Sequence, residues 1–456
     1  MSDTPSGQDS GHSAHPPVTV QGLSWPDLCP ALLLFRALPA ALSLTAMTLA
    51  LVGVLLTPLG WNVAEWIFVS GDMKQADTGL LQSTEMHGST WQAFFPGKET
   101  EPAFSWERLL GIGLVFSTMV DSVSGVFSLE SGLSRFLYFL TGSLWTILVW
   151  SFFGCAICRA ALMRFTRDDP VGLDECSRFA ADKFLSCFAG ITIPLAAVFG
   201  LAIPCAIIGL FLTTNPGAIV GGLLWFLVLL FALVMAVILL GLLFAWPLIV
   251  SSISCEGQDS FDGMSRGFAY VFQRPVNYFL YALTAVIFSG ICWFVMSLFI
   301  QGTIDTAWWA SSWGANLVND RMAELTNAPR AVSAEAHSPD NDQPGPLTGT
   351  LVAARWLIGF WNGLAWSLGT AFLYGLFWSL AAAVYLLLRR DLDETELDEI
   401  WMVDERRTYE LPPLSPGEED DVPEIEPATS GAGESGAGES GDGESGDGES
   451  GPHSQT

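Results

Sequence analysis

Long apolar runs without charge are the feature that most constrains this chain. Six stretches of at least 21 residues contain no Asp, Glu, Lys, Arg or His. A helix needs about 20 predominantly apolar residues to cross the hydrocarbon core of a bilayer. A transmembrane β-barrel would instead show short segments of alternating polarity. The sequence therefore predicts an all-α fold, namely a polytopic helical membrane protein with about six transmembrane helices.

The predicted spans form one membrane domain over residues 37–390, between a disordered N-terminus (1–36) and an acidic disordered tail (391–456). The spans are about 38–58, 136–158, 188–212, 219–249, 278–300 and 363–388. The first lacks the basic start, short apolar core and cleavage site of a signal peptide, so we expect an uncleaved signal anchor. Pro194 and Pro204 predict a kink in the third span, because each removes a backbone donor.

Segment 109–129 allows two interpretations. Its apolar residues and its polar residues fall on opposite helical faces. The apolar face is Leu109, Ile112, Phe116, Met119, Val123 and Phe127; the polar face is Ser117, Asp121, Ser124 and Ser128. This two-sidedness favours a helix in the membrane interface. A seventh span is the alternative, and it would place the two termini on opposite sides.

The distribution of Lys and Arg predicts the orientation. With six spans, the N-terminus, the loops 159–186 and 251–276 and the tail hold 12 of these residues, whereas segments 61–135 and 301–362 hold seven. Cytoplasmic loops carry the excess of Lys and Arg. We therefore expect a multi-pass protein of the inner (cytoplasmic) membrane with both termini in the cytoplasm.

Tryptophan is concentrated in the two outer segments. These residues are Trp61, Trp66, Trp91 and Trp106 in the first, and Trp308, Trp309, Trp313, Trp356 and Trp361 in the second. Tryptophan anchors at the headgroup level. We therefore expect both outer segments to lie along the membrane surface.

The two inner loops share an Asp-x-x-Ser-Arg motif and similar apolar stripes. The motif occurs at Asp174 and, 88 residues later, at Asp262. Opposite charges at i and i+4 meet on a helix surface, so each loop is predicted to be an amphipathic helix in the inner interface. Spans two and three would then be a parallel repeat of spans four and five. The candidate inner-face polar cluster is Arg159, Asp174, Ser177, Arg178, Asp262, Ser265 and Arg266. The alternative is that these helices only brace the bundle.

The last span carries small residues at every fourth position. They are Gly359, Gly363, Ser367, Ala371, Gly375, Ser379 and Ala383. Small residues at this spacing let helix backbones approach closely in lipid. We expect this seam to pack within the chain, and self-association or a partner membrane helix is the alternative.

Recognisable catalytic chemistry is absent from the sequence. The five histidines lie in termini or loops without metal-ligand spacing, and no phosphate loop or nucleophile elbow occurs. We expect no metal or cofactor, and an enzyme is the less favoured interpretation. Cys155 and Cys158 have redox spacing but end an apolar helix, which favours a packing role. No basic patch suits nucleic acid.

The C-terminal tail accounts for most of the net charge of −28. Residues 389–456 contain 21 acidic and four basic residues, and 431–450 are four Gly-rich pentapeptides. Such a composition cannot offset the entropy of ordering. Leu392, Leu397, Ile400 and Trp401 could dock a short continuation of the last span. A basic partner or divalent cations are candidate ligands of the tail, and a solubilising role is the alternative.

Two segments suggest a family. The sequences from Phe268 to Tyr278 (FAYVFQRPVNY) and from Tyr385 to Glu394 (YLLLRRDLDE) resemble a group of uncharacterised bacterial polytopic integral membrane proteins. The order of spans is distantly similar to the membrane domain of glycerophosphodiester phosphodiesterases, without their catalytic barrel. The resemblance covers about 130–390 and implies a bacterial inner membrane but no activity.

Two functions fit these features. The first is a non-enzymatic scaffold or envelope-organising role. The alternative is a permease-like or lipid-handling protein that uses a cavity between the repeated helix pairs. Membrane lipids are expected partners in either case. A polar cavity at mid-membrane depth would favour the alternative, whereas a tightly filled bundle would exclude it.

Overall fold

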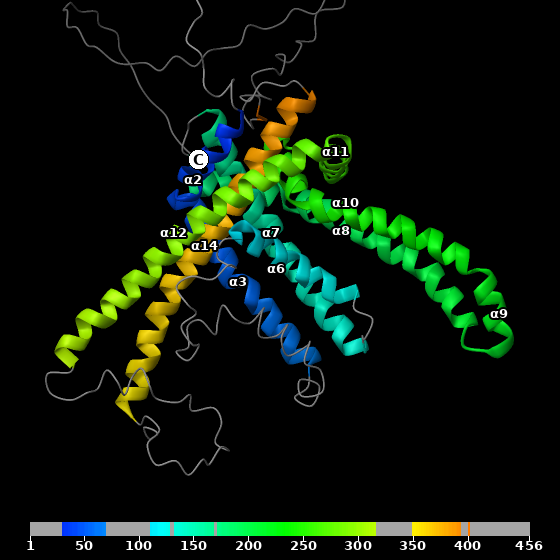
Figure 1. Ribbon diagram of the computed structural model, residues 1–456, viewed down its shortest axis with the longest axis horizontal. Helices are drawn as coiled ribbons and strands as arrows, with labels where there is room; N and C mark the ends of the chain where they lie inside the picture. Colours follow the sequence, from blue (N-terminus) through cyan, green and yellow to red (C-terminus); the bar gives the residue numbers. More distant parts are fainter. Residues whose placement is uncertain are drawn as a thin grey trace, which may run out of the picture. The chain divides into compact units, whose positions relative to one another are not determined.

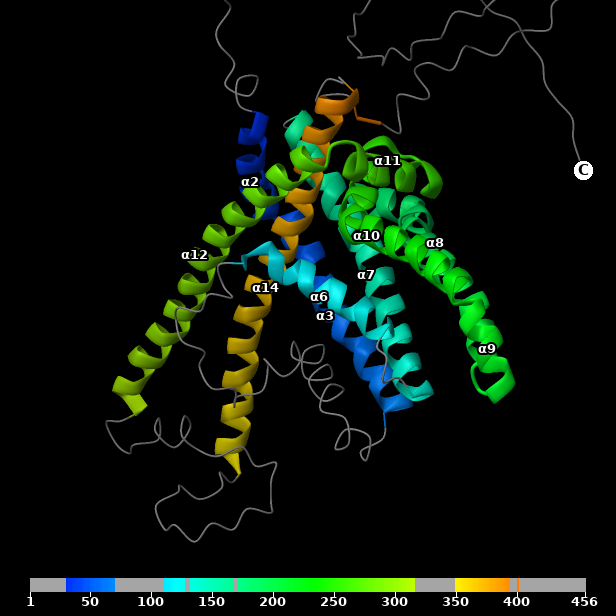
Figure 2. The same ribbon diagram turned by 45° about the vertical axis from the view of Figure 1, so that its right-hand side comes forward.

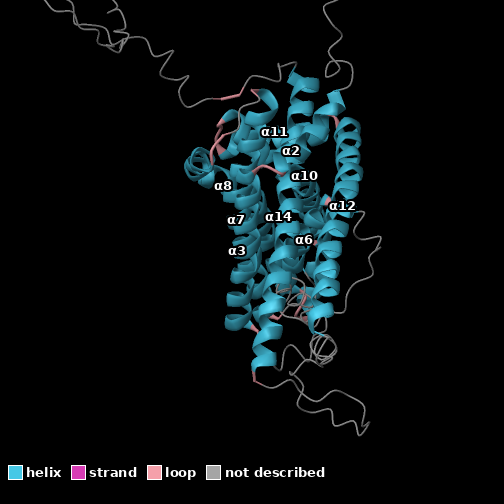
Figure 3. Ribbon diagram, turned by 90° about the vertical axis from the view of Figure 1, so that its left-hand side faces the viewer, coloured by secondary structure: helices cyan, strands magenta, loops and turns pink. Residues whose placement is uncertain are grey.

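The computed structural model describes residues 30–69, 110–127, 132–167, 171–315, 349–393 and 400–401. Every regular element within these residues is a helix (Figure 3). Six of the helices are long and apolar enough to cross a membrane. The predicted fold class, a polytopic helical membrane protein with about six spans, is therefore confirmed. Residues 1–29, Trp91, Trp106 and the tail beyond Trp401 lie outside the described residues.

The described helices run in chain order through all six spans (Figure 1). Their bounds are η1 Pro30–Arg36, α2 Ala37–Ala41, α3 Leu44–Phe68, α6 Ile112–Ser124, η3 Gly125–Phe127, α7 Leu133–Thr166, α8 Leu173–Phe211, α9 Asn215–Leu223, α10 Trp225–Glu256, α11 Ser260–Gln273, α12 Pro275–Ala315 and α14 Thr350–Asp393. The spanning helices are α3, α7, α8, α10, α12 and α14.

Several helices extend well beyond the predicted spans. The 41 residues of α12 and the 44 residues of α14 are roughly 60–65 Å long at 1.5 Å per residue. Segments 301–315 and 350–362 were predicted to lie along the membrane surface, but they continue these two helices. Apolarity marks where the hydrocarbon ends, whereas caps and prolines determine where a helix ends.

Residues 30–36 also differ from the prediction of a disordered N-terminus. They form η1, in which Leu33 and Leu34 are buried. The Arg36 guanidinium donates to the carbonyl oxygen of Phe165 at 3.1 Å. Contacts with the end of α7 therefore order the chain before the first span.

Helix α6 is too short to be a seventh span. Its 13 residues extend about 20 Å, against a hydrocarbon core of about 30 Å. Ile112 and Met119 on the predicted apolar face are buried, and Ser117 and Asp121 on the polar face are exposed. Gly111 has a φ of +51° at the start of α6, where the Ile112 N–H donates to Ser289 Oγ of α12 at 3.0 Å. This joint fixes α6 against the bundle.

Helix α14 is the central helix of the bundle. It packs against α2, α3, α7, α10 and α12, and all seven positions of the small-residue seam are buried within the chain. A Cβ on Gly375 would lie 3.6 Å from the carbonyl oxygen of Ala41 and 3.9 Å from the Cβ of Ala50. Small residues on both sides thus bring α14 close to α2 and α3.

Tryptophans join α3 to α7. The indole N–H of Trp61 donates to Thr146 Oγ1 at 2.9 Å, and that of Trp150 donates to Thr57 Oγ1 at 3.1 Å. Trp61 was predicted as an outer anchor, but it is fully buried because α3 continues past the predicted span. Trp66, Trp309, Trp313, Trp356 and Trp361 are exposed at the helix ends expected outside.

Helices α8 and α10 lie side by side and are joined by α9, while α12 diverges from α14 on another side of the bundle (Figures 1 and 2). Leucine, isoleucine and phenylalanine side chains on α8, α10 and α12 are widely exposed. Such faces are stable against lipid, because their side chains are apolar and their backbone hydrogen bonds are made within each helix.

We expect Gly154→Ala to destabilise the fold, because its Cβ would lie 2.5 Å from the buried Trp378 ring. Overpacking of this kind costs about 1–3 kcal/mol. In Gly375→Ala the added Cβ would lie no closer than 3.6 Å to any neighbouring atom, and in the control Gly302→Ala it would meet no atom within 4 Å. Both variants should therefore unfold at or above the wild-type temperature. Thermal unfolding of the purified protein in detergent measures this order, and equal midpoints for all three variants would contradict the packing described.

Candidate functional site: the polar cluster at the α11 end

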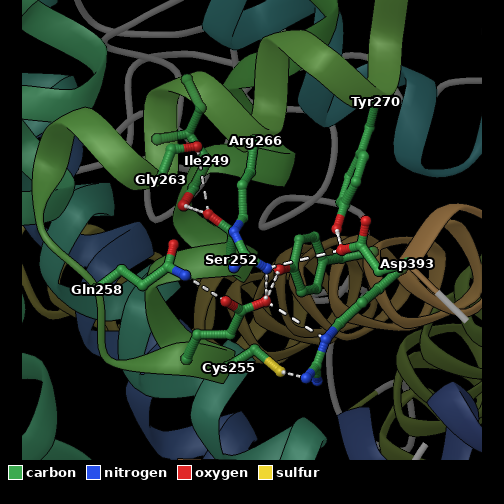
Figure 4. A network of polar contacts seen from close by, with 11 residues as sticks. Ile249, Ser252, Cys255, Gln258, Gly263, Arg266, Tyr270 and Asp393 are labelled. Atoms are coloured by element: carbon green, nitrogen blue, oxygen red, sulfur yellow. Dashed lines mark hydrogen bonds and ion pairs between the residues drawn. The ribbon is translucent and has the colours of Figure 1, made fainter. Parts of the chain in front are cut away.

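Charged side chains gather at one end of the bundle, here called the α11 end. It is the end where α7, α10 and α14 finish, where α8 and α12 begin, and where α11 lies (Figure 2). The charge-free middle of the predicted spans stops short of it. The side chains that meet there come from two consecutive helices, α10 and α11, and from the end of α14, which is more than 100 residues away in sequence (Figure 4).

Glu256, the last residue of α10, is the centre of the cluster. Its side chain is only 11% exposed and its Oε1 lies 2.6 Å from Arg266 Nη1 and 3.4 Å from Arg389 Nε. The Tyr385 hydroxyl donates to the same oxygen at 2.5 Å, and Gln258 donates to Oε2. A buried carboxylate needs such partners, because desolvation of an unpaired charge is costly.

Helix α11 supplies Arg266 and Tyr270 to the cluster. Its glycines Gly263 and Gly267 pack tightly on Ile249 and Ile253 of α10, which brings α11 near the end of that helix. The Tyr270 hydroxyl donates to Asp393 Oδ2 at 2.6 Å. One turn of helix separates Arg266 from Tyr270, so both reach the same side.

Helix α14 supplies Tyr385, Arg389 and Asp393, which are spaced by four residues and therefore share one face. Asp393 Oδ2 also lies 3.7 Å from Arg266 Nη1. Nearby, the Tyr281 hydroxyl of α12 donates to Asp391 Oδ2 at 2.8 Å. The end of α14 is thereby bonded to α10, α11 and α12.

Burial and pairing shift the pKa values of Tyr270 and Arg266 on α11. Burial and the hydrogen bond to Asp393 raise the pKa of the Tyr270 phenol above its ordinary value. Burial opposes the charge of Arg266, but Glu256, Tyr385 and Tyr270 together outweigh it and raise the pKa of this guanidinium. Both groups therefore keep their neutral-pH protonation states, with Tyr270 as a donor and Arg266 as a cation.

A cavity of about 440 Å³ adjoins this cluster. It is lined by Glu256, Arg266, Ala269, Tyr270, Gln273, Arg389, Leu392 and Asp393. Two acidic and two basic side chains line it, so their formal charges cancel. The cavity can therefore hold a polar group, but its net charge selects neither an anion nor a cation.

A second buried arginine lies apart from this cluster. Arg159 of α7 is 4% exposed, and its guanidinium donates to the carbonyl oxygens of Trp401 at 2.7 Å and Ser254 at 3.3 Å. It also stacks on the Phe179 ring at 4.6 Å. Arg159 therefore joins α7, α8 and α10 to the chain that follows α14.

Ile400 and Trp401 dock on this arginine. Ile400 is buried, and the Trp401 N–H donates to the carbonyl oxygen of Cys255 at 3.1 Å. The Lys183 ammonium lies 5.7 Å from the centre of the Trp401 indole. The two residues thus behave as the proposed docking segment, whereas Leu397 lies outside the described residues.

The two Asp-x-x-Ser-Arg motifs have different surroundings. Asp174 and Arg178 form the expected i,i+4 pair at 2.6 Å, but both side chains are more than three-quarters exposed. Ser177 donates to the carbonyl oxygen of Leu173. In the second motif Asp262 is exposed and Arg266 turns to Glu256. The predicted second Asp–Arg pair is therefore wrong.

The difference arises from proline. Pro275 starts α12 and disfavours a helical conformation at Arg274, whose φ of −130° and ψ of 58° end α11. No proline follows the first motif until Pro194, so α8 continues through that motif into the span. The first inner helix is consequently not a separate element, and Ser265 of the second is exposed.

Of the predicted cluster, only Arg159 and Arg266 join helices through polar contacts at this end: Arg159 is buried against backbone carbonyl oxygens, and Arg266 is partly exposed and pairs with Glu256. Sequence reasoning missed Glu256, Tyr270, Tyr385, Arg389 and Asp393. Four of these residues had a signal in the sequence, namely a spacing of four that puts side chains on one helix face. This spacing relates Tyr385, Arg389 and Asp393, and it also relates Tyr270 to Arg266. Glu256 had no comparable signal beyond its position at the end of an apolar run.

Two apolar cavities lie deeper in the bundle, on either side of α6. The first, of about 390 Å³, lies between α6, α7, α8 and α10; Trp246 and Trp378 also line it. The second, of about 300 Å³, lies between α6, α10, α12 and α14. The described residues therefore contain apolar space at the depth of the spans and polar space at the α11 end.

The described residues hold no group of three or more His, Cys, Asp or Glu side chains arranged as a metal site. Cys155 and Cys158 are buried free thiols without a disulfide bond, which is compatible with the predicted packing role. No family model matches the chain, and neither a curated protein nor a solved structure matches it. The resemblance to the membrane domain of glycerophosphodiester phosphodiesterases stays a prediction.

We expect Glu256→Gln to be strongly destabilising, because it leaves the charges of Arg266 and Arg389 without their shared carboxylate. Removing one partner of a buried pair costs about 3–5 kcal/mol. Asp174→Asn, which breaks an exposed pair at the same end, should cost no more than about 1 kcal/mol. Denaturant unfolding in detergent compares them, and similar losses for the two variants would refute the central role of Glu256.

We expect Trp401→Ala to uncover Cys255, which is fully buried and whose carbonyl oxygen accepts the Trp401 N–H. Maleimide labelling with mass-spectrometric site assignment should show faster modification of Cys255 than in wild type. Trp313→Ala, a change of an exposed indole, is the control and should leave the labelling rate unchanged. Unchanged labelling in Trp401→Ala would show that Trp401 does not cover this end of α10.

Proposed function

We propose that this chain is a lipid-binding membrane protein that holds acyl chains between its helices. The observation that carries the proposal is the apolar cavity of about 390 Å³ between α7–α8 and α10. Its volume falls in the range of about 300–1,000 Å³ that is usual for ligand pockets. It lies between α7 and α8, which the sequence predicts as the first helix pair, and α10, the first helix of the second predicted pair.

The depth of this cavity favours a lipid. Its lining residues on α7, α8, α10 and α14 all fall inside the predicted charge-free spans, from Ser143 on α7 to Trp378 on α14. A ligand at this depth is surrounded by hydrocarbon. Acyl chains are the apolar molecules that a bilayer supplies at this depth.

The lining chemistry disfavours transport of a polar solute. The cavity wall includes Ser122, Ser143 and Thr146, but their hydroxyls donate to backbone carbonyl oxygens of Thr118, Ser122, Phe139 and Gly142. Polar groups that are satisfied within a helix offer little to a ligand. The permease version of the alternative therefore has less support than the lipid-binding version.

A scaffold role is the second candidate. It is favoured by α10, of whose most apolar stretch only 11% is buried within the chain. A second membrane helix could cover this face as well as lipid does. Crosslinking of single-cysteine variants on α10 to a neighbouring protein would support the scaffold, whereas crosslinking to photoactivatable lipid would support the lipid-binding role.

We expect Leu239→Trp to reduce lipid binding, because the larger side chain fills the cavity of about 390 Å³ from α10. Added lipid at about 100 times its Kd should stabilise wild type by about 3 kcal/mol, and this gain should largely disappear in the variant. Native mass spectrometry should also show fewer retained lipids.

Leu233→Trp is the matched control, since Leu233 is exposed on the same helix and does not line the cavity. It should retain the lipid-dependent stabilisation of wild type. Equal stabilisation of wild type and both variants would refute binding in this cavity.

A further inference from the structure

We infer that the polar cavity at the α11 end binds the headgroup of a zwitterionic aminophospholipid, a phosphate ester that ends in a primary ammonium. The inference rests on the proposed lipid-binding function, and it places the acyl chain of this lipid in the second apolar cavity, of about 300 Å³, instead of the cavity of about 390 Å³. The juxtaposition that supports it is a partly exposed guanidinium beside a partly exposed carboxylate, in a polar cavity that shares α10 and α14 with an apolar cavity deeper in the bundle.

The two cavities are stacked along shared elements. Glu256 of α10 and Arg389 of α14 line the polar cavity, while Leu248 and Val384 of the same helices line the apolar cavity of about 300 Å³. At 1.5 Å per residue, the lining positions on these helices lie roughly 8–12 Å apart along the axis. That offset suits an amphiphile whose headgroup occupies the first cavity and whose acyl chain occupies the second.

Arg266 provides the phosphate contact. It reaches both Glu256 and Asp393 through the same atom, Nη1, and its side chain remains 39% exposed. The guanidinium also interacts with Tyr385, and its partly exposed surface lines the cavity. The planar donors of arginine suit the oxygens of a phosphate.

Asp393 provides the ammonium contact. Its Oδ2 accepts from Tyr270 and lies near Arg266, and its side chain remains 34% exposed. The second carboxylate oxygen can then accept from an ammonium group at the mouth of the cavity. An ammonium and a phosphate on one headgroup lie as close together as these two side chains do.

The balance of charge selects a zwitterion over an anion. Glu256 and Asp393 offset Arg266 and Arg389, so an anionic headgroup meets no surplus of positive charge. It would also place its phosphate near Asp393 with no ammonium of its own to pair with that carboxylate. A zwitterion offers each side chain a partner of opposite charge and leaves the site neutral.

The test is a lipid titration of the purified full-length protein by native mass spectrometry. The probes are phosphatidylethanolamine, its N-acetylated form, which lacks the ammonium, and phosphatidylglycerol, all with the same acyl chains. We expect phosphatidylethanolamine to bind about tenfold more tightly than either of the others, the effect of one charge-assisted contact. Asp393→Asn should abolish this preference, and the control Asp174→Asn should retain it.

Equal affinities of wild type for the three lipids would overturn the headgroup assignment, as would an Asp393→Asn variant that keeps the preference. The comparison of the three lipids needs no variant, so it remains decisive if Asp393→Asn fails to fold. Lipids that bind equally well but are lost in Leu239→Trp would leave the proposed function standing and remove only the headgroup site. Failure of all three lipids to bind would remove both.

Discussion

The close packing of α14 is the constraint on which the rest of the structure depends. In lipid, apolar side chains gain nothing from meeting each other rather than acyl chains, so helices associate through shape and van der Waals contact. The small residues of α14 supply that shape, and Gly375 meets Ala41 and Ala50 closely. A helix with large side chains along this face could not lie at the centre of the bundle. Its position in turn decides which residues of α14 reach the α11 end.

The polar cluster follows from this packing as a second layer of organisation. Once α14 is central, Tyr385, Arg389 and Asp393 lie beside the end of α10, where Glu256 has left the apolar layer. The glycines of α11 bring Arg266 and Tyr270 to the same place. Each charge then has an opposite charge or a hydroxyl within bonding distance. The charges of this cluster are thus confined to the α11 end, while the cavities at the depth of the spans remain apolar.

The sequence predicted the helical class, six spans and the two-sided nature of α6, because these depend on local apolarity and period. The predictions were wrong where the structure depends on the position of a helix end or on a contact between residues distant in sequence. Apolarity alone could not show that α3, α12 and α14 continue past the predicted spans, so Trp61 and the outer segments were misplaced. The Asp-x-x-Ser-Arg motif correctly predicted the ion pair of Asp174 with Arg178 but not one at Asp262. Arg266 pairs with the buried Glu256 carboxylate instead, and no spacing rule predicts that pair. Contacts between residues more than 100 positions apart, such as Glu256 with Tyr385, have no local signature.

The separation of Glu256 from its α14 partners has a consequence for synthesis. Tyr385 follows Glu256 by 129 residues, which a ribosome needs roughly 6–26 s to add at 5–20 residues per second. During that interval α10 must stay in the membrane with its terminal carboxylate already in place. Arg266, only ten residues further along, is available almost at once as a counter-ion, so the half-built protein need not hold an unpaired charge at the membrane boundary. The short-range ion pair thus serves the nascent chain, and α14 completes the site when it arrives last.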